Sequence, residues 1–268
     1  MALLSGLLDS GREAKDLAIA ELNPSRAQHL SQTYGVRVGN VADTADNADY
    51  VIIAVKPGDV DAVVETLSEL ATSADSGSAE QVVVSVAAGV TTEHLEAKLP
   101  AGSPVVRVMP NTPMLVGAGI SALARGRFAT DQQLADVSTI FDAVGTVLTV
   151  PESQMDAVTA VSGSGPAYVL LLAEAMVDAG VAAGLPRAVS TELVSKTLAG
   201  SAAMLLDRIA GSDSGGMDTS AAQLRASVTS PGGTTAAGLR ELERGGLRAA
   251  VDAAVAAAKT RSEQLRIT

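Results

Sequence analysis

The sequence contains no cysteine and only two histidines, His29 and His94. Without cysteine the chain can form neither a disulfide bond nor a zinc site with thiolate ligands, which fits a cytoplasmic protein. Neither histidine has a second histidine at the spacing of a metal-binding pair. We therefore expect no metal site and no hydrolase that uses a serine and a histidine.

Aromatic residues and positive charge are also scarce. Aromatic side chains make up 2% of the 268 residues, and tryptophan is absent, so small aliphatic residues must fill the core. The formal net charge of −11 gives nucleic acid or an anionic membrane no general basic surface to bind. An anionic ligand would have to be held locally, by backbone N–H groups and a few cations.

Long uninterrupted hydrophobic runs are missing as well. The N-terminal "MALLSGLL" is apolar, but no basic residue precedes it, so we do not expect a signal peptide. The most apolar segment, "AYVLLLAEAMVDAGVAAG", contains Glu174 and Asp178. We interpret it as a buried helix of a water-soluble protein rather than as a membrane span.

The residues that are present divide the chain near residue 151. Before this point, short β-branched runs alternate with helical patterns, which predicts a mostly parallel sheet covered by helices on both faces. The runs lie at residues 17–20, 50–55, 81–86, 104–109 and 146–150. After Pro151 the pattern is helical throughout. We therefore predict an α/β domain over residues 1–151 followed by an all-α domain over residues 152–268.

Three successive strands of this sheet are followed by small or rigid residues. Ligands bind beyond the carboxyl ends of parallel strands, and there the chain has "KPG" from Lys56, "AAG" from Ala87 and "PNTP" from Pro110. Each string alone is typical of a turn. Their recurrence at one edge predicts a surface on which a planar ligand lies close to the backbone.

The stretch "SVTSPGGTTAAGLRELERGG" places hydroxyls, a proline and two glycines just before an amphipathic helix. It can be a loop with an ordinary threonine cap, or a site where a helix N-terminus binds a small anion. Glu174 and Asp178 stand four residues apart on another helix, and we interpret them as helix-edge or interface residues. Lys196 could donate a proton, but its surroundings fit an ordinary amphipathic helix.

Six motifs, "AVKP", "SVAAGV", "RVMPNTP", "AVSGSGPAY", "GLPR" and "VTSPGGTTAAGLRELERGGLRAAV", resemble in their order the motif series of pyrroline-5-carboxylate reductases. The resemblance runs from about residue 2 to the C-terminus. It implies a Rossmann-type domain that binds NADPH and/or NADH, followed by an all-α C-terminal dimerisation domain that forms an intertwined homodimer, often assembled further. It also implies reduction of the cyclic imine 1-pyrroline-5-carboxylate to L-proline, the final step of proline biosynthesis.

The same resemblance assigns roles to individual residues. Thr235 would be the catalytic residue, which bonds the ring nitrogen of the substrate and helps to deliver its proton. The substrate-binding positions are Glu152, Thr229, Ser230, Gly232, Gly233 and Thr234. The cofactor-binding positions are Val55, Lys56, Pro57, Val86, Ala88, Gly89, Met109, Pro110 and Asn111. Residues 162–166 would close the site from the helical side.

Glu21 and Arg26 follow the first strand and bear on the choice of cofactor. An acidic side chain in this place can bond a ribose 2′-OH and repel a 2′-phosphate, whereas a nearby arginine can attract that phosphate. We therefore expect both residues to contact the cofactor, and both NADPH and NADH to be accepted.

The sequence departs from the Rossmann pattern at its start. The glycine-rich turn G-x-G-x-x-G and the strand before it are absent, and "MALLSGLLDSG" is similar to the helix that follows that turn. We interpret the first domain as N-terminally truncated, through a misassigned start or as a natural fragment, and expect weak cofactor binding. Two alternatives stay open: a related β-hydroxyacid-type dehydrogenase that uses Lys196, and a helical dimerisation module that no longer binds cofactor.

Overall fold

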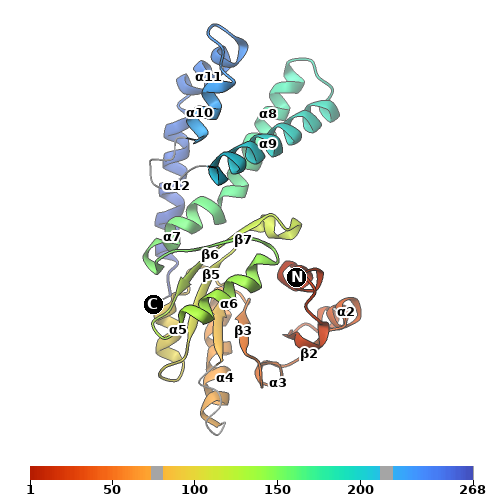
Figure 1. Cartoon of the computed structure of the whole chain (residues 1–268), viewed down its shortest axis with the longest axis vertical. Helices are drawn as coiled ribbons and strands as arrows, with labels where there is room; N and C mark the ends of the chain where they lie inside the picture. Colours follow the sequence, from red (N-terminus) through yellow and green to blue (C-terminus); the bar gives the residue numbers. More distant parts are fainter. Residues whose placement is uncertain (74–80, 212–219, 268) are drawn as a thin grey trace. The chain divides into compact units, whose positions relative to one another are not determined.

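The chain forms two compact units in a computed structural model that describes residues 1–73, 81–211 and 220–267 (Figure 1). The first unit is Met1–Pro166 together with Val255–Thr268, and the second is Ala167–Ala254. Strands occur in the first unit, and the described part of the second is helical. The first unit extends beyond residue 151 because Met155 is fully buried against small residues of the sheet.

Five strands form one mixed sheet in the order β3-β4-β5-β6-β7. They span Tyr50–Ile53, Val82–Ser85, Val105–Met109, Gly119–Arg125 and Gly145–Thr149. β3, β4 and β5 are parallel, β6 is antiparallel to β5, and β7 is parallel to β6. The apolar runs of the sequence do not predict β6. It runs antiparallel because only the short turn η4 (Thr112–Val116) links it to β5, and a parallel return needs a longer crossover.

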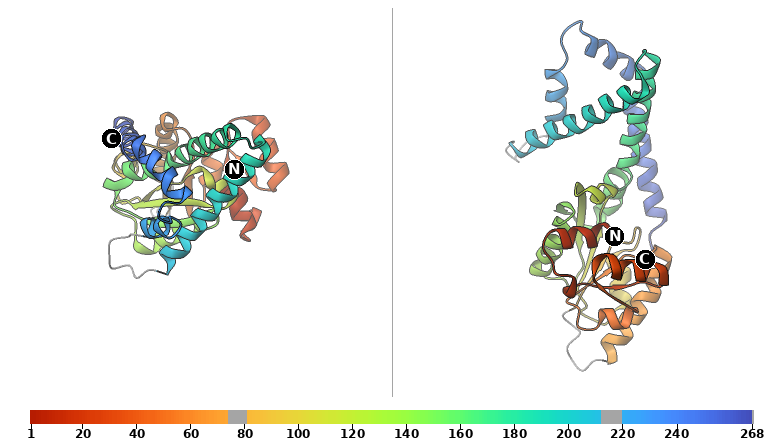
Figure 2. Two further views of the ribbon diagram at one scale, coloured as in Figure 1. Left: turned by 90° about the horizontal axis from the view of Figure 1, so that it is seen from above. Right: turned by 90° about the vertical axis from the view of Figure 1, so that its right-hand side faces the viewer.

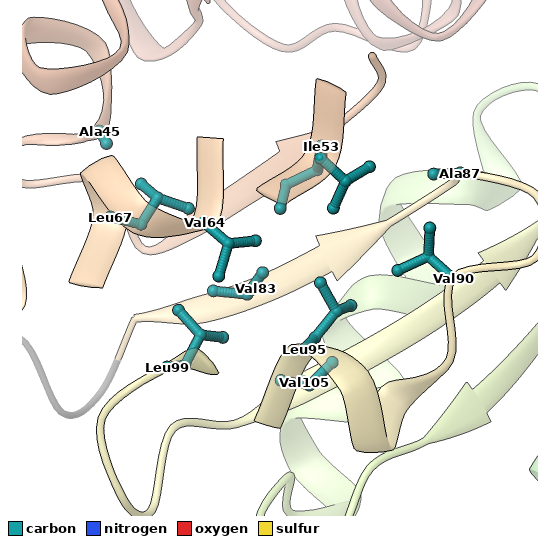
Figure 3. Packing of buried hydrophobic residues seen from close by; sticks show 11 residues of the cluster. Ala45, Ile53, Val64, Leu67, Val83, Ala87, Val90, Leu95, Leu99 and Val105 are labelled. Carbon is teal, nitrogen blue, oxygen red and sulfur yellow. The ribbon is translucent and has the colours of Figure 1, made fainter. Parts of the chain in front are cut away.

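Helices cover both faces of this sheet, as the continuous apolar strands predict. On one face, Val83 of β4 packs in a cluster with residues of α4 and α5, including Val64 and Leu95 (Figure 3). On the other face, Val82 and Val84 pack with residues of α1 and α6. The helices and helical turns of this unit are α1 Ala2–Asp9, η1 Ala14–Asp16, α2 Pro24–Tyr34, α3 Val41–Ala45, η2 Pro57–Asp59, α4 Val60–Ser73, α5 Thr92–Lys98, α6 Asp131–Asp142, η5 Glu152–Gln154, α7 Met155–Val158 and η6 Thr159–Gly163.

The strands β1 (Ala18–Ala20) and β2 (Arg37–Gly39) form a separate two-stranded parallel sheet. Between them, α2 begins after Asn23, whose side chain accepts a hydrogen bond from the next turn, and ends at Gly35 with a φ of 67°. In the doubly wound order, a first strand lies between the strands that correspond to β1 and β3. Among the described residues no strand occupies that place, so β3 is an edge strand.

The helical region contains α8 (Gly165–Ala182), α9 (Arg187–Ala210), α10 (Ser220–Ser227), α11 (Thr234–Arg244) and α12 (Leu247–Gln264). α8 and α9 form a helical hairpin through a turn at Gly184 (Figure 2). The two helices approach closely because Gly180 has no side chain: a Cβ there would collide with the Ser190 hydroxyl. That hydroxyl donates to the Val177 carbonyl oxygen at 2.9 Å.

The expectation that α8 is a buried helix is wrong for the single chain. Leu170 and Leu171 are 68% and 67% exposed, and Val177 is the buried residue of this helix. Among the described residues, the stretch Glu152–Ala182 is long and apolar enough, by length and composition alone, to cross a membrane. Val169, Leu172 and Met176 of α8 are exposed as well, so most of the apolar surface of this helix is uncovered in the single chain. This surface requires a partner or another apolar environment.

Candidate active site

The carboxyl ends of β3, β4 and β5 bring together the residues that the sequence assigns to the cofactor. Because these strands are adjacent and parallel, the segments that follow them lie at one edge of the sheet. Val55, Lys56 and Ala88 are exposed there, whereas Pro57, Val86, Met109 and Pro110 are half-buried. The exposed Ala88, beside half-buried apolar residues, fits the nicotinamide end of a dinucleotide. The sequence has no glycine-rich turn that would hold its pyrophosphate.

Two of the assigned cofactor residues also contact other parts of the chain. Gly89 is buried with a φ of 79°, and a Cβ on it would lie 2.5 Å from the Leu265 carbonyl oxygen. The Asn111 side chain accepts a hydrogen bond from the Ile120 N–H at 3.0 Å and donates one to the Ser162 carbonyl oxygen at 3.3 Å. The packing of the chain therefore requires both residues, whatever they contribute to a cofactor site.

Glu21 and Arg26 form an ion pair beyond the end of β1. The Glu21 Oε2 lies 3.2 Å from the Arg26 Nε, and the Glu21 Oε1 accepts a hydrogen bond from the Asn23 N–H at 2.9 Å. The Glu21 side chain is 21% exposed and the Arg26 side chain 58% exposed. The carboxylate is therefore held in place by two partners, while the guanidinium extends into solvent.

Glu152 contacts Arg107, a residue that the sequence pattern did not assign to the site. Arg107 lies on β5 and is 2% exposed, and its Nη1 is 2.6 Å from the Glu152 Oε1. The Arg107 Nη2 and the Glu152 Oε2 are buried without a hydrogen-bond partner among the described residues. A charged residue inside the apolar strand "VVRVM" is a signal that could have indicated Arg107, because such a charge is rarely buried unless paired.

Asp156 lies one helical turn after Glu152 and is 2% exposed. It accepts hydrogen bonds from the Ser262 Oγ at 2.7 Å and from the Arg266 Nε at 2.9 Å. Burial alone would raise the pKa of Asp156, but the hydrogen bonds from Ser262 and Arg266, with the positive charges of Arg266 and Arg107, hold it below its usual value. This carboxyl group is therefore ionised and paired at neutral pH.

A shallow hollow of about 360 Å³ opens beside η5, α7 and η6. Its walls are almost entirely apolar, and its lining includes Ala122, Leu148, Val158 and Ser162. An apolar hollow does not hold a carboxylate, because nothing replaces the water that the charge loses. An anionic substrate therefore needs a different binding group.

The backbone N–H groups at the start of α11 are suited to bind an anion. The helix begins at Thr234 after Gly233, and no side chain within the described ranges caps its N–H groups. The alternative of an ordinary threonine cap is therefore not observed. Gly232 has a φ of 70°, and a Cβ added to it would extend into open space. Ser230 and Thr235 are exposed. Free N–H groups at the positive end of a helix bind anions.

The remaining candidates of the helical region lie on exposed surfaces. Glu174 and Lys196 are exposed on α8 and α9. Asp178 is paired with Arg187 at 2.7 Å, and both side chains are more than half exposed. The Thr229 hydroxyl donates to the Arg225 carbonyl oxygen at 2.6 Å. Its oxygen can therefore still accept a hydrogen bond, but its proton is already used. A helix-edge or interface role of Glu174 and Asp178 stays a prediction.

The structure thus gathers the assigned residues into two groups. The cofactor residues and Glu152 lie in the first unit, and the residues from Thr229 to Thr235 lie in the second. A dinucleotide-binding edge in an α/β unit and a helical region with uncovered apolar surface together define an oxidoreductase with a dimerisation region. The family comparison agrees: residues 1–89 match the family described as NADP oxidoreductase, coenzyme F420-dependent.

Residues 152–265 match the pyrroline-5-carboxylate reductase dimerisation family. The chain is 62% identical to the pyrroline-5-carboxylate reductase of Mycobacterium tuberculosis, over 100% of this chain and 93% of the relative. It is 63% identical to that of Mycobacterium leprae, with the same coverage. The chain belongs to the pyrroline-5-carboxylate reductase family.

Solved structures of the family have the same fold. A pyrroline-5-carboxylate reductase from Coxiella burnetii matches with a TM-score of 0.89 and 33% identity, over 100% of this chain and 94% of that one. A Plasmodium falciparum pyrroline carboxylate reductase, solved with NADP bound, matches with a TM-score of 0.81 and 29% identity, over 98% and 93% of the two chains.

Proposed function

We propose that this protein reduces 1-pyrroline-5-carboxylate to L-proline with NADPH or NADH, as the final step of proline biosynthesis. One observation carries the proposal: the "SPGGTT" stretch forms an open helix N-terminus in a chain 62% identical over its whole length to a reductase of this name. The substrate has one carboxylate and one C=N bond. A helix N-terminus with adjacent hydroxyls suits both groups.

The roles of the residues follow from the chemistry of the substrate. The N–H groups after Gly232 and Gly233 hold the carboxylate, and the hydroxyls of Ser230 and Thr234 lie beside it. Thr229, whose hydroxyl donates to the Arg225 carbonyl oxygen, shapes this turn. The Thr235 hydroxyl bonds the ring nitrogen and passes the proton to it, directly or through water. An imine nitrogen is protonated readily, so the reaction needs no histidine.

The edge of the sheet binds the cofactor. NAD(P)H, when bound, supplies the hydride. Val55, Lys56 and Pro57 lie along the dinucleotide, and Glu21 and Arg26 face its adenosine ribose. The nicotinamide end is held by Val86, Ala88, Gly89, Met109, Pro110 and Asn111. Glu152 and residues 162–166 close the site from the helical side, so that catalysis rests mainly on orientation of the two reactants.

The helical region, residues 152–268, carries the substrate turn and the dimer contacts. The match to a dimerisation family and the exposed leucines of α8 support an intertwined homodimer, and dimers of this kind can assemble into higher homo-oligomers. In such a dimer α8 is buried against the partner chain. This burial accounts for its apolar surface, and no membrane is needed. With no cysteine in the chain, the cytoplasm is the compartment that we propose.

The test is product formation by the purified protein. With NADPH and 1-pyrroline-5-carboxylate, we expect proline and NADP⁺ in equal amounts, measured by chromatography and by loss of the reduced-nicotinamide absorbance. A β-hydroxyacid-type dehydrogenase would instead oxidise a hydroxy acid and leave the imine unchanged. A dimerisation module without cofactor would alter neither compound.

A further inference from the structure

The end of α12 returns to the sheet and contacts two segments of the proposed active site. Ser262 and Arg266 bind Asp156, which follows Glu152 by one helical turn. Ile267 pairs as a short parallel bridge with Val90, directly after the cofactor loop. We call these residues, 262–267 with Asp156, the C-terminal clasp.

The attachment to the cofactor loop is made by backbone groups. The Ile267 N–H donates to the Gly89 carbonyl oxygen at 2.8 Å, and the Thr91 hydroxyl donates to the Ile267 carbonyl oxygen at 3.3 Å. The Leu265 carbonyl fills the space where a side chain of residue 89 would lie. The Ile267 side chain packs against the apolar cluster under this loop. The clasp therefore holds the end of the Val86–Gly89 loop, through its contacts with Gly89, Val90 and Thr91.

The clasp is attached to Asp156 by an ion pair with Arg266. Asp156 is almost fully buried, and a buried carboxylate is unfavourable unless its partners stay in place. Arg266 provides two of its nitrogen atoms to one carboxylate oxygen of Asp156, and Ser262 binds the other oxygen. Loss of Arg266 would leave the carboxylate with one hydroxyl partner, so that residues 265–267 would lose their charged attachment and keep only the contacts of Ile267.

We propose that Asp156, Ser262 and Arg266 are positioning residues, which hold the Val86–Gly89 loop in the conformation that binds the nicotinamide end of NAD(P)H. The inference rests on the proposed function for the identity of the ligand. It assigns to the C-terminal residues a role in cofactor affinity, although none of them belongs to the predicted cofactor site. Glu152 keeps its own partner, Arg107, and the hydroxyl-bearing turn before α11 is not part of the clasp. The affinity for the imine substrate therefore depends on the clasp much less.

The experiment compares Arg266→Ala and Arg266→Lys with the unmodified chain, and uses Lys259→Ala as the control. Lys259 forms an exposed ion pair with Glu263 on the same helix and takes no part in the clasp. NADPH affinity is measured by nicotinamide fluorescence without substrate. For Arg266→Ala we expect the dissociation constant and the KM for NADPH to rise on the order of tenfold, with the KM for the imine changed less than twofold. Arg266→Lys should restore part of the affinity, and Lys259→Ala should match the unmodified chain.

A second measurement needs no ligand. Amide hydrogen exchange of residues 86–91 should be faster in Arg266→Ala, while exchange in α6 stays the same. If Arg266→Ala does not fold, Ser262→Ala and Ser262→Thr replace it, and the threonine variant, which keeps the hydroxyl, should bind NADPH more tightly than the alanine variant.

Two results overturn the clasp: an unchanged NADPH dissociation constant in a folded Arg266→Ala, or an equal rise of both KM values. The proposed function is tested separately. If no proline forms, but the NADPH affinity still differs tenfold between Arg266→Ala and the unmodified chain, the proposed reaction is wrong and the clasp is supported.

Discussion

The two threonines at the start of α11 have different expected roles, although both are exposed. Thr234 is the first helical residue and contributes its N–H group to the anion site. We assign the transfer of the proton to the ring nitrogen of the substrate to Thr235. Thr235→Ala should therefore lower kcat by about two orders of magnitude, while the NADPH affinity stays nearly unchanged. Steady-state kinetics and a fluorescence titration measure the two quantities.

Thr139→Ala is the control for this variant, since Thr139 is an exposed threonine on α6. It should leave both quantities unchanged. If kcat of Thr235→Ala equals that of the unmodified protein, Thr235 has no part in the mechanism.

The ion pair of Glu21 and Arg26 bears on the choice between NADPH and NADH. Glu21 forms an ion pair with Arg26. It therefore opposes a 2′-phosphate in two ways: its charge repels the phosphate, and it occupies the Arg26 guanidinium that could bind the phosphate. Glu21→Gln removes both effects. We expect the ratio of kcat/KM for NADPH to that for NADH to rise about fivefold, the equivalent of ~1 kcal/mol for an exposed charge pair.

Glu13→Gln tests whether any loss of negative charge has this effect, because Glu13 pairs with Lys15 on the same unit. Its cofactor ratio should stay the same. A strict NADPH requirement of the unmodified protein, with no turnover of NADH, would show that the Glu21 carboxylate does not act as we propose.

At the scale of elements, the edge of β3 is the main irregularity of the fold. β1 and β2 form their own sheet, so within the described part of the chain no strand pairs with one edge of β3, where the doubly wound order has a strand. A strand in this place would join the two sheets. The turn after it would also bring glycine N–H groups to the start of α1, where a pyrophosphate binds.

Because this edge is open among the described residues, we expect a strand and a glycine-rich turn engineered onto the N-terminus to raise the cofactor affinity of the chain. The segment is about fifteen to twenty residues long, enough for one strand and a G-x-G-x-x-G turn. NADPH should bind more tightly to the extended protein, and its thermal midpoint should rise. A glycine-serine extension of equal length should do neither. Equal NADPH affinity of the extended and unextended chains would contradict this prediction.

At the scale of the whole molecule, the uncovered surface of α8 predicts an obligate dimer. Leu170 and Leu171 are more than two-thirds exposed in the single chain, and burial of such leucines contributes about 1.5–3 kcal/mol each. Leu170→Glu should therefore shift the protein from dimer to monomer in sedimentation velocity at micromolar concentration. Leu22→Glu, at a leucine of the first unit that is 94% exposed, should remain a dimer. A stable monomer of the unmodified chain would contradict the proposal.

The sequence by itself determined the local structure and the family. Asn23 and Gly35 delimit α2 because capping depends on neighbouring residues alone. The apolar runs became strands, with helices on both faces, because an alternation of strands and helices leaves few other ways to bury them. Likewise, α11 begins at Thr234, directly after the two glycines. The assigned site residues after β3, β4 and β5 lie at one edge because parallel strands end there together.

Only the tertiary structure decided what depends on distant residues. Arg107 and Glu152 are 45 residues apart, and Asp156 and Ser262 are 106 apart. No periodicity or spacing links such positions, because their pairing follows from the path of the whole chain. The same holds for the direction of β6, for the exposure of α8 and for Gly89. The sequence assigns this glycine to a cofactor, but its packing is determined by Leu265, which reaches it only when the last helix returns to the sheet.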